Sequence, residues 1–207
     1  EVLGVSLLTH EVKAVLREGE ITEALVGLEA LLTALSPAFA GLAAAYEQKG
    51  LREVELTLVH RYLSYVLGQQ LHAAMRGFFV RVVDSRNILA LYKSLRTGLP
   101  GTGRFLDGGT IPVTRLTDLI EREDVREVAG LIRKATGLAI SSPEPTQVET
   151  ALYRGISKFL RAEGRNPLGI ALILDYLWRC QLEVMNLSLL LVGKDLERNE
   201  IAAELVR

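Results

Sequence analysis

Apolar residues recur every three or four positions along nearly the whole chain, which is the spacing of amphipathic helices. The first two stripes are separated by Gly19, and the second ends at Ser36-Pro37. Their members are Leu7, Leu8, Val12, Val15 and Leu16, then Ile21, Leu25, Leu28, Leu31 and Leu32. No convincing run of alternating apolar and polar residues is present. The sequence therefore predicts an all-α protein without a sheet.

The same spacing predicts further helices along the chain. A short helix runs through Phe39 and Leu42, and a long one covers Leu51 to Met75, with a junction at Gly77. Further predicted helices cover about 78–95, 146–163, 167–192 and 197–206. Between them, helical spacing resumes at Leu116, Leu119 and Ile120 and again from Val125 to Ile132. Thr146 is the expected N-cap of its helix, with Glu149 three residues later.

A Gly-rich segment, TGLPGTGRFLDGGTIP, is the clearest connector in the chain. We place the domain boundary there, with helical units at residues 1–98 and 113–207 and a linker at 99–112. A phosphate-binding loop is the alternative interpretation. The segment lacks the Gly-Lys-[Ser/Thr] ending and follows no buried strand, so a flexible linker accounts better for its glycines.

The two units resemble each other in sequence. REGEITEALVGL, from Arg17, aligns with EREDVREVAGLI, from Glu121, and Val54-Glu55 aligns with Val148-Glu149. Asp84, Asn87 and Ile88 align in turn with Glu183, Asn186 and Leu187. Because three blocks match in the same order, we interpret the chain as two repeats of about 100 residues, each with two short and two longer helices.

The shared [Asp/Glu]-x-x-Asn pattern places a carboxylate and an amide on one helical face. Buried at a helix junction, Asp84 with Asn87 and Glu183 with Asn186 would satisfy open backbone groups of neighbouring helices. Exposure to solvent is the alternative, and it suits Asp84 and Asn87 better than Glu183, which has many apolar neighbours. A chemical role for the pairs is the third possibility.

Composition narrows the class of protein. The 207 residues carry 24 basic and 25 acidic side chains, and 49% of them are apolar. The apolar fraction excludes a disordered chain, and the near-neutral charge argues against binding to nucleic acid or anionic lipid through the overall field. No stretch of 18 residues lacks a charge, so no membrane span is expected. The chain starts at Glu1 and not Met, from which we expect a trimmed sequence.

Candidate catalytic and metal-binding groups do not form a recognisable set. His10, His60 and His72 lack metal-ligand spacing, and the single Cys180 reads as a buried small hydrophobe in an apolar helix. Glu121, Glu123 and Asp124 lie among arginines in what reads as a solvated turn. We therefore expect no catalytic residue, no metal, no cofactor and no small-molecule substrate.

Basic residues follow the region from Arg76 to Arg96. Arg81, Arg86 and Lys93 are the members that we expect to face an acidic partner surface. The alternative is ordinary solvation with local pairing to Asp84.

Three segments in this order resemble the C subunit of V/A-type rotary ATPases, whose eukaryotic counterpart is the d subunit. They are FFVRVVDSRNILALYKSLRTG, the linker with FLDGGTIP, and NPLGIALILDYLWRCQLEVMNLSLLLVGK, and the closing DLERNEIAAELV adds to the resemblance. Family members resemble a funnel of three similar helical domains. This chain matches the last two, which implies that a first domain either precedes this sequence or is absent from the protein.

The resemblance implies a mechanical role. A member of this family is a non-catalytic adaptor of the central stalk that couples the shaft, made of the D and F subunits, to the membrane proteolipid ring during proton or sodium transport. It implies a peripheral protein at the cytoplasmic face of the membrane, without a nucleic-acid partner. Two alternatives remain. One is a related helical scaffold or regulatory protein acting outside a rotary ATPase, and the other is a small-ligand or lipid-binding helical bundle with a pocket lined by Tyr62, Tyr65, Phe78 and Phe79.

Overall fold

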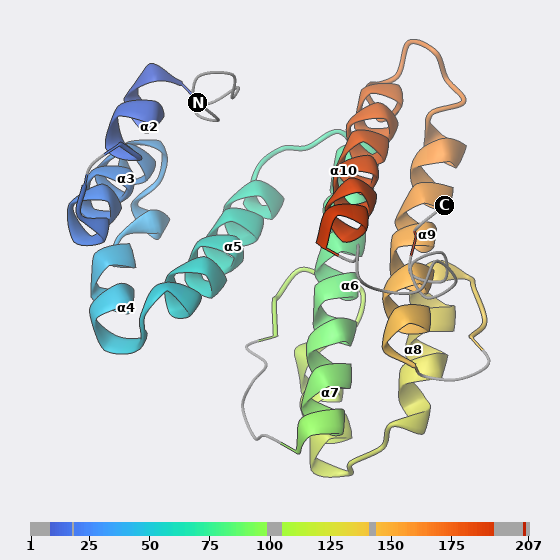
Figure 1. Ribbon diagram of the computed structural model, residues 1–207. Helices are drawn as coiled ribbons and strands as arrows, with labels where there is room; N and C mark the ends of the chain where they lie inside the picture. The colour runs from blue at the N-terminus through green and yellow to red at the C-terminus, as the bar shows by residue number, and fades with distance from the viewer. Residues whose placement is uncertain (1–8, 18, 99–104, 141–143, 193–204, 206–207) are drawn as a thin grey trace. The chain divides into compact units, whose positions relative to one another are not determined.

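The computed structural model describes residues 9–17, 19–98, 105–140, 144–192 and 205, and all regular elements within them are helical. The helices are α2 (His10–Val15), α3 (Ile21–Leu35), the 3-10 turn η1 (Pro37–Phe39), α4 (Leu42–Lys49), α5 (Leu51–Gly68), α6 (Ala73–Thr97), α7 (Val113–Glu121), α8 (Arg126–Thr136), α9 (Pro145–Glu163) and α10 (Ile170–Val192) (Figure 1). The prediction of an all-α fold is confirmed. The predicted helix at 197–206 lies outside the described residues, apart from Leu205.

The chain packs as two compact units, Glu1–Gln69 and Gln70–Arg207. The first holds α2 to α5 and the second α6 to α10. This division does not coincide with the boundary placed at residues 99–112, because α6 packs against α7, α8, α9 and α10. The sequence duplication is a separate matter and stays a prediction. Its aligned blocks fall on α3 and α8, on α5 and α9, and on α6 and α10.

The unit of residues 1–69 has a small core made by three helices. Leu25, Leu42 and Val54 are buried together, one each from α3, α4 and α5. Phe39 of η1 is buried as well and contacts the ring of Tyr65, with 5.7 Å between the ring centroids. A core with so few large side chains buries little apolar surface.

Glu29 caps a helix other than its own. The α4 N-terminus has Gly41 as its N-cap residue, which offers no side chain. The Glu29 carboxylate, from α3, accepts hydrogen bonds from the Gly41 N–H at 2.6 Å and the Ala43 N–H at 3.0 Å. These two bonds lower the pKa of Glu29 below the ordinary value of 4.5. The carboxylate thus joins α3 to α4 and satisfies open amide groups of α4.

Glu29→Ala is expected to lower the free energy of unfolding of the first unit by about 1 kcal/mol at neutral pH. Because the pKa of Glu29 is lower in the folded than in the unfolded state, its contribution is complete above the unfolded pKa and is lost as pH falls through the folded pKa. Amide hydrogen exchange in α4, compared between neutral pH and a pH below the folded pKa, measures this. A difference between variant and wild type that is as large at the lower pH would contradict the assignment.

The predicted helix from Leu51 to Met75 is interrupted, which corrects the sequence interpretation. α5 ends at Gly68, and α6 begins after His72, whose Nδ1 accepts from the Ala74 N–H at 3.2 Å as an N-cap. Gly77, the predicted junction, lies inside α6. A Cβ atom built there would meet Phe159 Cζ at 2.6 Å, so this glycine serves close packing against α9 and not a break.

The second unit is a bundle around one large core. Buried residues from four helices and from the loop before α7 form it, namely Ile88, Leu91, Tyr92, Ile111, Leu116, Leu119, Val128, Leu131, Ile132, Val148, Ala151 and Leu152. α10 packs on α9 and α6 (Figure 1). α9 begins at Pro145 with Glu144 as its N-cap residue, so the prediction of Thr146 in this role was wrong. α10 packs against the early part of α6 and the later part of α9 through side-chain contacts that are described below.

Candidate functional site

A polar clamp on α6 holds the loop that leads to α7. Asp84 is buried, and its Oδ1 accepts hydrogen bonds from the Thr110 N–H at 2.8 Å and the Ile111 N–H at 3.2 Å. The Thr110 hydroxyl donates to Asp84 Oδ2 at 2.7 Å. A buried carboxylate is costly unless it is hydrogen-bonded, and these three donors meet that requirement.

Asn87 completes the polar clamp one helical turn later. Its Nδ2 donates to the Leu106 carbonyl at 2.8 Å, and its Oδ1 accepts from the Leu106 N–H at 2.7 Å. Both backbone groups of Leu106 are thereby satisfied by one side chain that is itself 1% exposed. Asp84 and Asn87 therefore attach the loop to α6 at two points.

The loop can approach α6 because it carries two consecutive glycines with different tasks. Gly108 has φ of 95°, a backbone region that favours glycine. Gly109 has no room for a side chain, since a Cβ atom there would lie 2.3 Å from Asp84 Oδ1. Residues 105–112 are thus pinned to α6, which corrects the flexible-linker interpretation for this part of the segment. The amides of Thr110 and Ile111 bind Asp84 and form no phosphate cradle.

The second [Asp/Glu]-x-x-Asn pair lies in different surroundings. Glu183 is exposed on α10, against the expectation that apolar neighbours bury it, and Asn186 is partly buried. The face of α10 that turns toward α9 and α6 buries Ala171, Asp175 and Leu182. Glu183 follows Leu182 and is rotated about 100° away from that face. The surroundings of Asp84 and Glu183 are therefore not equivalent, although their sequences align.

Of the three basic residues expected to face a partner, two are exposed. Arg86 and Lys93 are exposed on α6, and their separation of seven residues places them on one face. Arg81 differs, because its guanidinium lies over the Phe159 ring at 3.7 Å and donates to the Gly77 carbonyl at 3.0 Å. Burial lowers the pKa of Arg81, while Asp84 and Glu163 oppose this. The predicted stripe therefore reduces to Arg86 and Lys93.

An apolar face on α10 was missed at the sequence level. Ile173, Leu177, Cys180, Val184, Leu187 and Leu191 recur at alternating spacings of four and three, and we name these six residues the α10 seam. Each of the five large members leaves more than half of its surface exposed. Cys180 is only partly buried, which corrects its assignment to the core. The spacing is readable in the sequence, but α10 is apolar on several faces, so the pattern alone does not tell which face stays exposed.

The opposite face of α10 is anchored on α9 by an aromatic cluster. Trp178 Nε1 donates to Ser157 Oγ at 2.9 Å, and the Trp178 ring lies 6.0 Å from Phe78 and 5.9 Å from Tyr153, measured between centroids. Asp175 is 4% exposed and bonded to Arg179, while its Oδ1 finds no hydrogen-bond partner among the described residues. These contacts orient α10 so that the α10 seam is turned away from the bundle.

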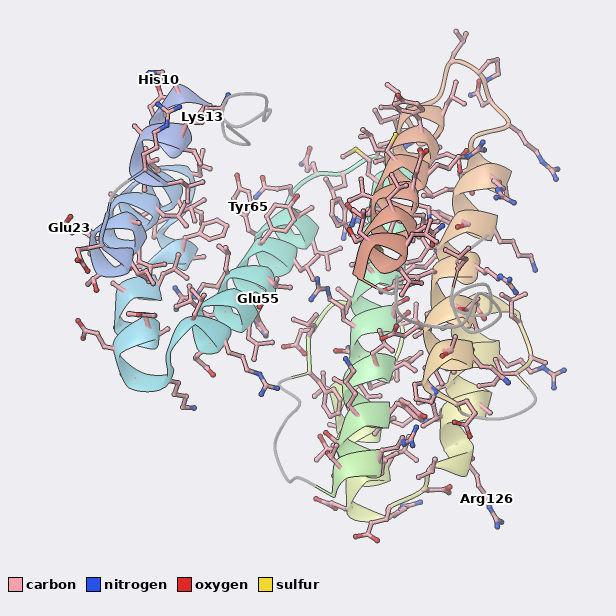
Figure 2. The ribbon with its side chains drawn as sticks, viewed as in Figure 1. His10, Lys13, Glu23, Glu55, Tyr65 and Arg126 are labelled. Atoms are coloured by element: carbon pink, nitrogen blue, oxygen red, sulfur yellow. The ribbon has the colours of Figure 1, made fainter. Side chains whose placement is uncertain are left out.

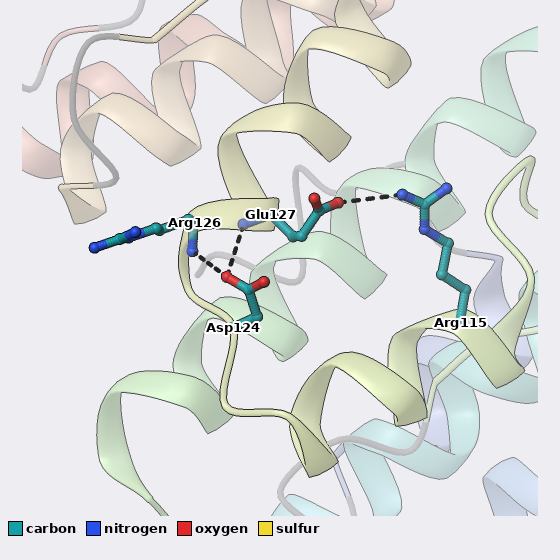
Figure 3. A network of polar contacts seen from close by, with 4 residues as sticks. All are labelled: Arg115, Asp124, Arg126 and Glu127. Carbon is teal, nitrogen blue, oxygen red and sulfur yellow. Dashed lines mark hydrogen bonds and ion pairs between the residues drawn. The ribbon is translucent and has the colours of Figure 1, made fainter.

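The acidic turn between α7 and α8, with Glu127 that follows it, uses carboxylates for hydrogen bonds and an ion pair that hold the two helices in place. Asp124 Oδ1 accepts from the Arg126 N–H at 3.0 Å and the Glu127 N–H at 3.4 Å, while Glu127 pairs with Arg115 of α7 at 3.2 Å (Figure 3). The Arg126 side chain points away from the network (Figure 3). Asp124 is therefore used to start α8, and the Arg115–Glu127 pair joins α7 to α8.

The remaining candidate groups are dispersed. Among the described residues, no three His, Cys, Asp or Glu side chains gather as metal ligands. His10 lies at the start of α2, whereas Glu55 and Tyr65 lie on α5 (Figure 2). Phe78 contacts Phe79 and Trp178 in one unit and Tyr65 contacts Phe39 in the other. No helix in the described ranges is both long and apolar enough to cross a bilayer.

Comparison with known proteins identifies the family. A search of curated proteins gives no match. The family model described as ATP synthase (C/AC39) subunit matches residues 1–204, which is almost the whole chain. This agrees with the resemblance in α6, in the loop at 105–112 and in α10. The chain belongs to the ATP synthase (C/AC39) subunit family.

Proposed function

We propose that this protein is a non-catalytic adaptor in the central stalk of a V/A-type ATPase or ATP synthase. It couples the rotating shaft, made of the D and F subunits, to the membrane proteolipid ring, as a peripheral protein on the cytoplasmic face of the membrane. The observation that carries the proposal is the family match over residues 1–204. The proposal leaves chemistry to other subunits and assigns this chain a mechanical task.

The second unit has features that suit transmission of torque. Its core is drawn from four helices and one loop, and dense cores of this kind are stiff and poorly compressible. The polar clamp attaches the loop before α7 to α6 by five hydrogen bonds. A body that carries torque must keep its helices in register under load, and both features serve this.

Reconstitution tests the proposal directly. The chain, with any further sequence of its natural protein, is mixed with the D–F complex and with detergent-solubilised proteolipid ring, and the assemblies are separated by size. We expect it to join both. A protein that joins neither would overturn the proposal and leave a scaffold or regulatory role outside a rotary ATPase.

Charge reversal of Arg86 and Lys93 together is expected to weaken binding to the D–F complex by about threefold to tenfold at low salt, with less effect at high salt. Both side chains are exposed, so the fold is expected to tolerate the change. Reversal of the exposed Arg133 and Lys134 on α8 is the control, because it alters net charge equally. Equal affinities of the two double variants, measured by pulldown, would contradict a partner-facing role for Arg86 and Lys93.

A further inference from the structure

Exposed basic residues follow one face of α9. Arg154, Lys158 and Arg161 are four and three residues apart, so their side chains leave the helix on the same side, and all three are exposed. Arg165 adds a fourth exposed basic side chain just after the helix ends at Glu163. We name Arg154, Lys158, Arg161 and Arg165 the α9 basic row.

The acidic residues of α9 lie away from this row. At about 100° per residue, Glu149 is rotated by about 140° from Arg154, and Glu163 is rotated by about 160° from Arg161. The charge of Glu163 acts instead on Arg81 of α6, whose pKa it raises. Among the described residues, no carboxylate forms an ion pair with any member of the α9 basic row. Its positive charges are therefore not neutralised within the described structure.

The end of α8 extends the positive surface. Lys158 Nζ lies 3.6 Å from the position that a Cβ atom would take at Gly137, the residue that ends α8. Arg133 and Lys134 belong to the last turn of that helix and are exposed. Lys158 therefore brings the α9 basic row next to two further cations. A chain whose net charge is near neutral thus presents a local positive surface.

This surface has no apolar anchor. In the described part of residues 70–207, the exposed large hydrophobic residues begin at Leu168, so none of them lies on α7, α8 or α9. Protein interfaces have an apolar or aromatic centre at which charged residues are depleted. A face that offers only long basic side chains suits instead a fluid anionic surface, which requires no complementary shape. The headgroup layer of an anionic membrane is such a surface.

We propose that the α9 basic row binds the headgroups of anionic phospholipids and so holds the second unit to the membrane surface. This inference rests on the proposed function, because that function brings a membrane, among all polyanionic surfaces, next to this chain. Each Lys or Arg near an anionic bilayer strengthens binding by about fivefold at physiological salt. The inference adds a lipid contact on α9 to the subunit contact expected at Arg86 and Lys93 of α6.

Co-sedimentation of the full chain with vesicles tests the proposal. One set of vesicles is phosphatidylcholine alone, and the other contains about 30% phosphatidylglycerol. The forms compared are wild type, Arg154→Glu with Lys158→Glu, and Arg122→Glu with Arg126→Glu. The last is the matched control, because it changes the net charge equally at two exposed residues near the end of α8 that is opposite Gly137. Circular dichroism and the urea midpoint verify that each variant keeps its fold.

We expect wild type to bind the anionic vesicles and not the neutral ones, and added salt to weaken this binding. Reversal of Arg154 and Lys158 should weaken it by at least about 20-fold, since two attractive charges become repulsive. The control variant should stay within about threefold of wild type, because Arg122 and Arg126 lie outside the α9 basic row.

Each other outcome has a defined meaning. Equal binding of wild type to both kinds of vesicle, no binding to either, or equal binding by the two double variants overturns the inference. Because the vesicles contain no D, F or ring subunit, none of these results affects the proposed function, which the reconstitution experiment decides separately. Tighter binding to a DNA duplex than to anionic vesicles would assign the α9 basic row to nucleic acid. Loss of binding to the D–F complex with vesicle binding unchanged would assign it to an acidic protein surface, and either result rejects the proposal.

Discussion

Asp84→Ala is expected to lower the free energy of unfolding by about 3 kcal/mol, since it leaves two backbone N–H groups and one hydroxyl of the loop without their acceptor. Asp84 and Ile111 are each 2% exposed, so solvent replaces the carboxylate poorly at the Ile111 N–H, whereas Thr110 is exposed and its two donors are only partly buried. Asp84→Asn keeps the shape and one acceptor oxygen, so we expect it to lose about half as much. Urea titration at neutral pH measures both.

Thr110→Val is the control for the polar clamp. It removes only the hydrogen bond from the hydroxyl to Asp84 Oδ2 and keeps both hydrogen bonds from the backbone N–H groups. The expected decrease in the free energy of unfolding is therefore about 1 kcal/mol. The expected order of stability is wild type, Thr110→Val, Asp84→Asn and Asp84→Ala. Ordinary surface substitutions change the free energy of unfolding by about 0.5 kcal/mol or less. An effect of Asp84→Ala within this range would show that the polar clamp contributes little to stability.

Gly155→Ala is the second substitution with a large expected effect, a destabilisation of about 1–3 kcal/mol from overpacking. A Cβ atom at this position of α9 would lie 2.5 Å from both Thr136 Cβ and Thr136 Cγ2 of α8. Helix propensity alone favours alanine over glycine by about 1 kcal/mol, so the sign of the result separates packing from propensity. Thermal or urea unfolding gives the sign.

Gly130→Ala provides the matched control on α8. Its added Cβ would meet nothing closer than Glu127 Oε2 at 4.0 Å, and the residue is exposed, so propensity should dominate and stabilise the protein by up to about 1 kcal/mol. Thr136→Ser, which removes Cγ2, should recover part of the loss caused by Gly155→Ala. Stabilisation by both alanine substitutions would mean that α8 and α9 are not in tight contact at Gly155.

Local spacing predicted the helices well because each depends mainly on its own apolar stripe. The positions of α8 and α9 follow from apolar residues three and four apart, and their burial confirms the faces. In the stripe of α3 only Leu25 is buried, and Ile21 is exposed. The break between α5 and α6 was misplaced for a physical reason. Gly77 looks like a helix breaker in sequence, but what it accommodates is the ring of Phe159, which is distant in the chain.

The site residues were less predictable, since their surroundings are set by tertiary contacts. Arg81 and Arg86 look alike in sequence, yet one stacks on Phe159 and the other is exposed. The carboxylate of Glu29 serves a helix whose N-cap residue lies twelve residues later, which no local rule indicates. Asp84 and Glu183 align in the two repeats, but within the described residues only Asp84 has a glycine loop folded against it.

The polar clamp has a mechanical consequence. A pull on the chain at Pro112 reaches Asp84 first, and one applied at Phe105 reaches Asn87 first, because the anchored residues are Thr110 and Ile111 at one end and Leu106 at the other. From either direction, these hydrogen bonds therefore transfer the tension to α6 before it can extend the backbone at Gly108 and Gly109, which lie between the two anchored positions. The two glycines, which have the greatest backbone freedom in this loop, therefore bear little of the load. Their flexibility does not make the transmission of force through α6 more compliant.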